Sequence, residues 1–261
     1  MRFSIITVCR NNLPGLKKTY SSLIEQTFTE YEWIVIDGNS TDGTREWLQS
    51  INNEVIWISE PDDGIFDAMN KGITLAHGEY LLFLNSADRL SHNGLLEKVN
   101  DSINLSNKQP VFIYGDSIDI NNSGTLLYRK SKNYKTLWRG MFTQHQAMFF
   151  RLNQNILYKK EYSITADYEY VGQHLKNLKE EDIIYLETPF CEFELGGLNE
   201  SSRIKALKED YLIRKNEFGI NIFICGLLYI LHFIHTMQKR MLPRTAYMLR
   251  YKKLRTKTHK A

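Results

Sequence analysis

Acidic side chains follow three of the predicted strands, each at the point where the strand ends. Asp37 closes a strand at 33–36, Asp62 and Asp63 follow a strand at 55–59, and Asp88 follows an apolar run at 80–84. Ligands of open α/β sheets bind beyond the carboxyl ends of the strands, so we expect these carboxylates to meet in one crevice. Such a cluster repels itself unless a cation or hydrogen-bond donors lie within it. Mg²⁺ or Mn²⁺ between carboxylate and phosphate oxygens would relieve that repulsion. Taken singly, the same residues are also common turn and capping residues.

The first 90 residues alternate predicted strands and helices, which would place these acids. Strands are expected at 3–9, 33–36, 55–59 and 80–84, and helices after the turn at 10–12, from about Gly43, and at 65–76. Ser40 or Thr41 is expected to cap the second helix. The order predicts parallel strands with right-handed crossovers, and the wholly apolar run at 80–84 predicts a central parallel strand.

The alternation loosens after Asp88. Helices are predicted at 95–105, 166–178 and 203–218, the last with Ile204, Leu207, Tyr211 and Phe218 facing inward. Strands are predicted at 111–114, 126–128 (an edge strand), 148–150 and 183–186. The two glycines within 194–198 are expected either to let a loop close over bound ligands or to form a simple turn.

Composition and charge exclude several classes of protein. The chain has 261 residues, of which 43% are hydrophobic and 24% charged, as is ordinary for a folded soluble core. Cys9, Cys191 and Cys225 are far apart, which argues against a disulfide framework or a zinc site and favours a reducing cytoplasm. The strand beginning at Phe3 leaves no room for a secretory signal. The sequence contains neither GxGxxG nor GxxxxGK[ST], so dinucleotide binding and P-loop hydrolysis lack their usual phosphate cradles.

Four segments together resemble a known family. IITVCRNN, IVIDGNSTDGT, SEPDDGIFDAMNKGI and HGEYLLFLNSAD, in this order and spacing, resemble the family 2 inverting glycosyltransferases, and most closely the bacterial group that builds capsule, exopolysaccharide or O-antigen repeats. The resemblance is strongest from Phe3 to Arg89, continues through QHQAMFFR and ITADYEY, and is absent beyond about residue 218. It implies an α/β fold of the GT-A type, a mainly parallel sheet flanked by helices, over residues 1–218.

The resemblance also assigns residues to a nucleotide-sugar donor. It implies that the base of the nucleotide, with a preference for UDP, lies near Thr7, Arg10, Asn11 and Asp37. Asp62, Asn70 and Lys71 would close over the nucleotide, and Asn85 lies at the tip where a bound group is held. Asp88 is the candidate ligand for Mn²⁺ or Mg²⁺, although Ala87 stands where this family commonly has a second acid. Thr7 and Asn11 could equally serve strand and turn packing, and Lys71 could simply be solvated.

On the acceptor side, inversion requires a base that takes the proton of the attacking hydroxyl. The match of ITADYEY to the family's acidic motif implies that Asp167 is this base, at the start of a helix that favours the ionised carboxylate. Asp167 could instead only cap the helix, and Glu169 is the substitute if the register differs by two. His145 in QHQAMFF is a second catalytic candidate, with a hydrogen-bonded structural role as its alternative.

Residues 219–261 form a predicted C-terminal appendage. The stretch 220–237 is mostly apolar, and 239–261 carries nine Lys or Arg and no acid, which leaves 24 basic against 30 acidic residues in the rest of the chain. The stretch is borderline for a spanning helix, suits an anionic membrane surface, and could also pack on the body as a hairpin. Nothing in the sequence resembles a module that reads nucleic acid.

The sequence therefore predicts an inverting transferase at the cytoplasmic leaflet, which moves a hexose-type sugar from a nucleotide-sugar donor to a lipid-linked glycan. Two alternatives stay open at this point. Ala87 is compatible with a catalytically weakened binding protein of the same fold. A nucleotidyltransferase that makes the sugar nucleotide would need a Gly-rich pyrophosphate loop after the first strand, which residues 10–15 match poorly.

Overall fold

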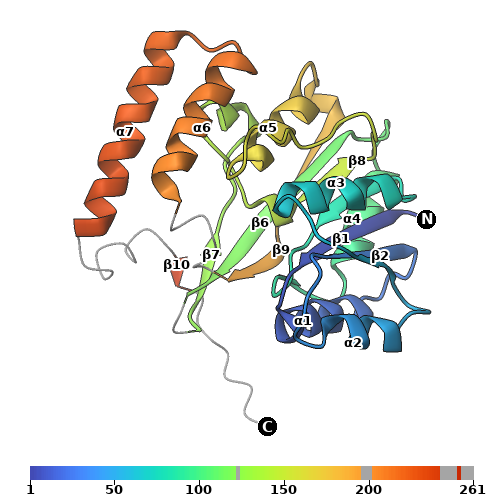
Figure 1. Ribbon diagram of the computed structural model, residues 1–261. Helices are drawn as coiled ribbons and strands as arrows, with labels where there is room; N and C mark the ends of the chain where they lie inside the picture. The colour runs from blue at the N-terminus through green and yellow to red at the C-terminus, as the bar shows by residue number, and fades with distance from the viewer. Residues whose placement is uncertain (122–123, 195–201, 242–251, 254–261) are drawn as a thin grey trace.

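A computed structural model describes residues 1–121, 124–194, 202–241 and 252–253. Within them the chain forms one mixed sheet flanked by helices on both faces (Figure 1). The strands are β1 (Phe3–Cys9), β2 (Tyr31–Asp37), β3 (Ile56–Ser59), β4 (Tyr80–Phe83), β5 (Arg89–Leu90), β6 (Phe112–Ile120), β7 (Leu126–Arg129), β8 (Met148–Arg151), β9 (Ile183–Glu194) and β10 (Lys252–Lys253). The α-helices are α1 (Leu13–Ile24), α2 (Thr44–Ser50), α3 (Ile65–Leu75), α4 (Leu95–Asn104), α5 (Ala166–Leu175), α6 (Arg203–Asn216) and α7 (Ile222–Met241). Short 3₁₀ helices occupy Tyr134–Arg139, His145–Ala147 and Glu180–Asp182.

The strand order is β10-β7-β6-β8-β4-β1-β2-β3, and β9 pairs with both β5 and β6. β4, β1, β2 and β3 run parallel, so their carboxyl ends share one edge of the sheet. β4 is central as predicted, but only one of its neighbours is parallel, because β8 inserts antiparallel between β4 and β6. β7 is not an edge strand, since β10 pairs with it on the side away from β6.

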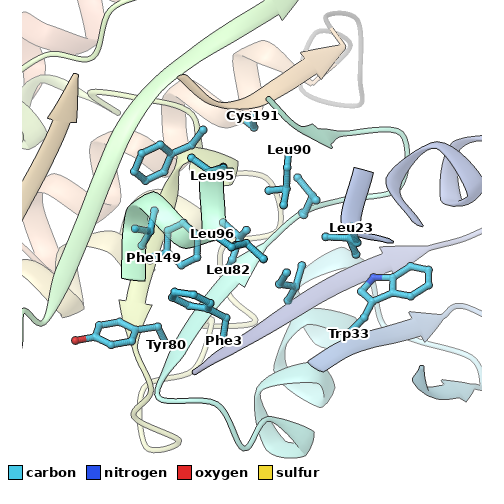
Figure 2. Packing of buried hydrophobic residues seen from close by; sticks show 14 of the residues in the cluster. Phe3, Leu23, Trp33, Tyr80, Leu82, Leu90, Leu95, Leu96, Phe149 and Cys191 are labelled. Atoms are coloured by element: carbon cyan, nitrogen blue, oxygen red, sulfur yellow. The ribbon is translucent and has the colours of Figure 1, made fainter. Parts of the chain in front are cut away.

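The sheet separates two hydrophobic cores, as the alternation of side chains along a strand requires. On one face Phe3 and Ile5 of β1 pack with residues of α1, α2 and α4 (Figure 2). On the other face Ile6 and Val8 pack with residues of α3 and α5. α3 and α5 therefore lie on the same face of the sheet.

Several predicted details of the elements are wrong. α2 is preceded by Gly43 in a left-handed conformation (φ +91°), and Asp42, not Ser40 or Thr41, accepts hydrogen bonds at its first residue. Ile204 is 41% exposed, whereas Leu207 is buried as predicted, and the rest of the inner face of α6 is formed by Ala206, Glu209, Ile213 and Arg214. α5 ends at Leu175, three residues earlier than predicted.

Other expectations are confirmed or lie outside the described residues. Cys9, Cys191 and Cys225 are free and buried, as their spacing predicted. Glu194 ends β9, whereas 195–198 of the predicted glycine loop and most of the basic C-terminal stretch lie outside the described residues. The predicted division at 218/219 falls in the connection between α6 and α7. No helix in the described part of the chain is long and apolar enough to cross a membrane.

Candidate functional site

The loops after β1 and β2 are joined by hydrogen bonds at the carboxyl edge of the sheet. The backbone N–H of Asn11 donates to Ser40 Oγ (2.7 Å), and the hydroxyl of Ser40 donates to Asp37. Asn11 Oδ1 accepts from the backbone N–H of Thr41 (2.8 Å), and Asn11 has φ +50°, which Asn tolerates better than most residues. The two loops thus form one wall of the edge.

Two predicted base-binding side chains are occupied by protein groups. Asp37 is fully buried and accepts from the Ser40 backbone N–H (3.0 Å), the Ser40 hydroxyl and the Ser59 hydroxyl (2.6 Å). The hydroxyl of buried Thr7 donates to the carbonyl of Leu84 (2.7 Å) and accepts from Trp33 Nε1 (2.9 Å). These side chains position the edge, in keeping with the packing role left open for Thr7. Among the residues predicted around the base, Arg10 and Asn11 have exposed side chains.

Arg10 and Asp62 both lie close to Gly38, the residue after β2. A Cβ at Gly38 would clash with Asp62 Oδ2 and lie 3.3 Å from Arg10 Cδ, so a larger residue here would displace the Asp62 carboxylate. Asp62 Oδ1 accepts from the backbone N–H of Gly64 (3.0 Å), the residue that precedes α3. Arg10 makes no ion pair with any residue of the described ranges, so a cation is available at this edge for an anionic group.

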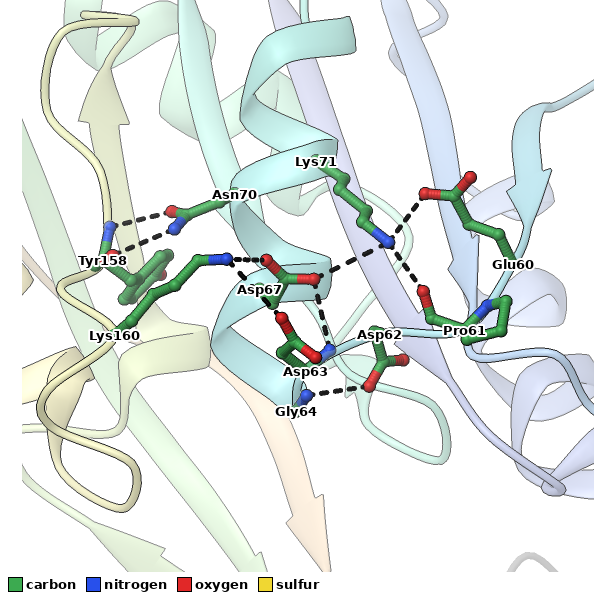
Figure 3. A network of polar contacts seen from close by, with 10 residues as sticks. All are labelled: Glu60, Pro61, Asp62, Asp63, Gly64, Asp67, Asn70, Lys71, Tyr158 and Lys160. Carbon is green, nitrogen blue, oxygen red and sulfur yellow. Dashed lines mark hydrogen bonds and ion pairs between the residues drawn. The ribbon is translucent and has the colours of Figure 1, made fainter.

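The predicted pair on α3 belongs to a polar network (Figure 3). Lys71 Nζ lies 2.7 Å from Glu60 Oε1, 2.9 Å from the carbonyl of Pro61 and 3.6 Å from Asp67 Oδ2. The hydrogen bond with Glu60 raises the pKa of Lys71. The side-chain amide of Asn70 donates to the Tyr158 carbonyl (2.9 Å) and accepts from the Tyr158 N–H (2.8 Å). Both side chains anchor α3 to neighbouring segments.

Asp88 is 5% exposed and lies beyond the end of β4. Gln146 Nε2 donates to its Oδ2 (3.0 Å), and burial raises the pKa of Asp88 to about 8. Asn85 Oδ1 is also buried and has no hydrogen-bond partner within the described ranges. Sequence reasoning passed over Gln146, although its place two residues before β8 and beside His145 was visible in QHQAMFF.

The side-chain oxygens of Asp88 and Asn85 are of the kind that binds Mg²⁺ or Mn²⁺. Both cations prefer carboxylate and carbonyl oxygens, and a cation would offset the cost of ionising a buried carboxylate. No group of three or more His, Cys, Asp or Glu residues suited to a metal occurs in the described residues. Further metal ligands would therefore have to come from other groups, and the oxygens of a bound diphosphate are suited to this role.

Asp167 lies in the first turn of α5 and is partly exposed. Ring contacts indicate the direction of this helix. The Tyr170 ring contacts both Phe83, at the end of β4, and Phe150, with centroids 5.7 and 5.1 Å apart, whereas the His174 ring, one turn later, contacts Phe150 (4.8 Å), which lies further from the carboxyl edge. The N-terminus of α5 therefore points to the carboxyl edge, where β4 leads into Asp88. Burial, followed by the charges of Asp210 and Glu209, raises the pKa of Asp167 to about 7.

The loop before Asp167 is held by Glu209 of α6, which sequence reasoning missed. Its buried carboxylate accepts from the backbone N–H groups of Ser163 (3.1 Å), Ile164 (2.8 Å) and Thr165 (3.0 Å). Arg214 is fully buried one turn later, where Nε donates to the Trp138 carbonyl (3.1 Å). No local pattern marks these contacts, since the bonds of Glu209 span 44 to 46 residues.

The structure gives His145 a packing role, the alternative left open above. Its ring stacks on Phe83 with centroids 5.0 Å apart, and Nε2 lies 3.0 Å from the hydroxyl of Tyr158. Burial lowers the pKa of His145 to about 3, so the ring is neutral and poorly suited to accept a proton. Glu169 is also buried and pairs with Lys159 (3.2 Å) and Gln173 (2.7 Å). Asp167 is the better candidate base.

Known proteins resemble this chain in sequence and in fold. The model of the family "Glycosyl transferase family 2" matches residues 4–168. An uncharacterized glycosyltransferase of Mycobacterium tuberculosis (strain H37Rv) is 31% identical over 234 residues, covering 83% of this chain and 86% of that protein. A PGL/p-HBAD biosynthesis glycosyltransferase of Mycobacterium bovis is 29% identical over 185 residues, covering 64% of this chain and 67% of that protein.

Solved structures share the fold at low sequence identity. TarS of S. aureus (residues 1–349) in complex with UDP has a TM-score of 0.64 at 17% identity, covering 97% of this chain and 76% of that one. The mannosyltransferase PcManGT of Pyrobaculum calidifontis, in complex with GDP-Man and Mn²⁺, has a TM-score of 0.62 at 14% identity, covering 87% and 69%. The predicted GT-A fold is thereby confirmed.

Proposed function

Because the chain belongs to glycosyl transferase family 2 and is a glycosyltransferase, we propose that it moves a sugar from a UDP-sugar to a hydroxyl of a lipid-linked glycan, with inversion at the anomeric carbon. The observation that supports the proposal is Asp167, which lies in the first turn of α5 and whose pKa is raised to about 7, mainly by burial. A general base works best when its pKa is near the operating pH.

The donor would bind along the wall formed by the loops after β1 and β2. Arg10 offers a cation for phosphate oxygens, and Asn11 and Asp62 offer polar groups beside Gly38. Thr7, Asp37, Asn70 and Lys71 would act by holding this wall and α3 in place, because their polar groups bond to protein. Complexes of TarS with UDP and of PcManGT with GDP-Man support a nucleotide-sugar donor.

Inverting transfer is a single displacement. The acceptor oxygen forms a bond to the anomeric carbon as the bond from that carbon to the diphosphate oxygen breaks. The hydroxyl proton passes to Asp167, and the nucleoside diphosphate leaves with the bonding electrons. Asp88 and Asn85 would hold Mg²⁺ or Mn²⁺, which would neutralise charge on the leaving diphosphate. The Mn²⁺ in the PcManGT complex supports this cofactor.

The names of relatives and the exposed surface of α7 support the proposed acceptor and location. One relative is named for PGL/p-HBAD biosynthesis, and another, of Bacillus subtilis, is named a putative teichuronic acid biosynthesis glycosyltransferase. Exposed apolar side chains of α7 precede a basic stretch at 239–261. We therefore place the enzyme at the inner face of the plasma membrane, where anionic lipid attracts Lys and Arg.

Turnover tests the proposal against a binding protein of the same fold. The purified chain is incubated with a panel of nucleotide sugars and a lipid-diphosphate glycan acceptor, with and without Mn²⁺, and the anomeric configuration of the product is read by NMR. We expect an inverted product with a UDP-sugar, and a loss of about 10²-fold or more in kcat for Asp167→Asn. Donor binding without release of nucleotide from any donor would instead identify a catalytically weakened binding protein.

A further inference from the structure

A cleft between α6 and α7 lies outside the site described above. The two helices lie side by side (Figure 1), and the cleft has a volume of about 380 Å³. It is lined by Tyr211 and Leu212 of α6, by Gly226 and Tyr229 of α7, and by Lys208. A Cβ built on Gly226 meets no atom within 4 Å, so this glycine leaves the wall of the cleft open. The volume falls within the range of about 300–1,000 Å³ that small-molecule sites occupy.

The apolar surface continues from the cleft onto the open side of α7. Phe223 is 83% exposed, Leu227 58% and Ile230 55%, although each is large and apolar. Leu212 of α6, which lines the cleft, is also exposed. A contiguous apolar surface of this kind usually marks a site of interaction.

Charge indicates which apolar occupant suits the cleft. Lys208 lines it, is exposed, and makes no ion pair with any residue that the structure describes. From Gly219 to the C-terminus the sequence contains no Asp or Glu. The cleft exposes apolar atoms only, so Lys208 lines it with its alkyl stem. An apolar cleft beside an exposed lysine suits a ligand that has a hydrocarbon chain and an anionic head.

The position of α6 links the cleft to the candidate base. Lys208 lines the cleft, whereas the next residue, Glu209, holds the loop before Asp167 from the buried face of the same helix. A chain bound in the cleft would therefore lie across one helix from the base.

We propose that this cleft binds the hydrocarbon chain of the lipid-linked acceptor, with Lys208 beside its phosphate. The assignment rests on the proposed function for the identity of the acceptor. The cleft would hold the acceptor lipid while its glycan reaches the carboxyl edge of the sheet.

Gly226→Leu tests this assignment, because it adds an apolar side chain to the cleft lining at a position where a Cβ meets no atom within 4 Å. Gln238→Leu is the matched control, since it adds the same side chain at an exposed position of α7 outside the cleft lining. Lys208→Ala is compared with Lys215→Ala, another exposed lysine of α6 that does not line the cleft. Binding of hexadecyl phosphate is measured by calorimetry, and KM is measured for glycan acceptors carried on hexadecyl or on phenyl diphosphate.

We expect Gly226→Leu and Lys208→Ala to weaken hexadecyl phosphate binding and to raise KM for the long-chain acceptor about tenfold, with little change for the phenyl acceptor and none in the two controls. Equal effects on both acceptors would overturn the proposal, as would unchanged binding. It would also be overturned if wild-type protein bound phosphatidylglycerol micelles as tightly as hexadecyl phosphate, or if Gly226→Leu converted a dimer to a monomer. The binding arm needs no turnover, so its result stands even if no acceptor is glycosylated.

Discussion

The titration of Asp167 gives the sharpest test of the proposed base. Its pKa of about 7 is raised first by burial and then by the charge of Asp210, with Glu209 contributing on the same helix. Since only the ionised carboxylate accepts the hydroxyl proton, kcat/KM should rise with pH through this value. The ionised fraction grows from about 0.09 at pH 6 to about 0.91 at pH 8, a gain of about tenfold. A carboxyl with its ordinary pKa would already be ionised at pH 6, and the profile would be flat.

The variant Asp210→Asn tests whether the rise of kcat/KM with pH, the acid limb of the profile, is due to Asp167. Removing a neighbouring negative charge makes ionisation of Asp167 easier, so the acid limb should move to lower pH, by about one unit. Arg214, which lies 3.6 Å from Asp210 Oδ2, keeps its positive charge in the variant and acts in the same direction. At pH 6 the variant should retain about half of its own plateau rate, against about a tenth for the wild type.

The assay is release of nucleoside diphosphate between pH 5.5 and 8.5 at saturating Mn²⁺, with each profile normalised to its plateau. Asp88 also has a raised pKa, about 8, but its neighbours are Gln146, Asn85 and Glu194 rather than Asp210. A limb caused by Asp88 would therefore stay in place in Asp210→Asn. A flat wild-type profile, or a limb that fails to move in the variant, would refute Asp167 as the titrating base.

Three further outcomes follow from the buried polar groups. Asp88→Asn should raise the free energy of unfolding at pH 8 by about 1 kcal/mol or more while lowering turnover. The reason is that the raised pKa of Asp88 makes the stability of the wild type fall as pH rises from about 4 to 8. Urea unfolding of both proteins at pH 5 and pH 8 measures this difference. His145→Phe should keep kcat within about threefold, since a neutral stacked ring is replaced by another, and a loss of about 10²-fold would restore His145 as a catalyst. Glu209→Ala should lower the free energy of unfolding, measured by heat or urea, by about 2–5 kcal/mol, because three backbone N–H groups lose a buried acceptor. Glu209→Gln should lower it less, and equal losses in the two variants would contradict that reasoning.

The first half of the fold was predictable because its signals are local. β1 matches its predicted range, and α3 differs by one residue, since apolar spacing alone marks both. β6 was predicted to end at Tyr114 but continues to Ile120, because Asp116 and Asp119 are buried within the strand. Asp116 is stabilised there by Tyr128, Ser131 and Tyr185. The hydrogen-bond donors of such a buried acid lie far along the chain, so the local sequence around the acid looks like that of a turn.

The sequence motifs predicted which segments form the candidate site, but not which protein groups their side chains contact. The four segments indicated the carboxyl edge of the sheet, and ITADYEY indicated Asp167 as the base, which stays a prediction. The motifs could not separate residues that face a ligand from residues that hold the edge together. Thr7, Asp37 and Asn70 carry the expected residue types, yet their polar groups bond to Leu84, Ser40 and Tyr158. Only the geometry of their partners shows this difference.

α6 joins features that the sequence presents separately. Its buried face carries Glu209, which fixes the loop before the candidate base, and Arg214, which holds the carbonyl of Trp138. Its other side lines the apolar cleft with Tyr211 and Leu212. A helix packed on both sides cannot shift without moving the contacts of both. α6 is therefore the element through which the proposed lipid site and the loop before Asp167 are in physical contact.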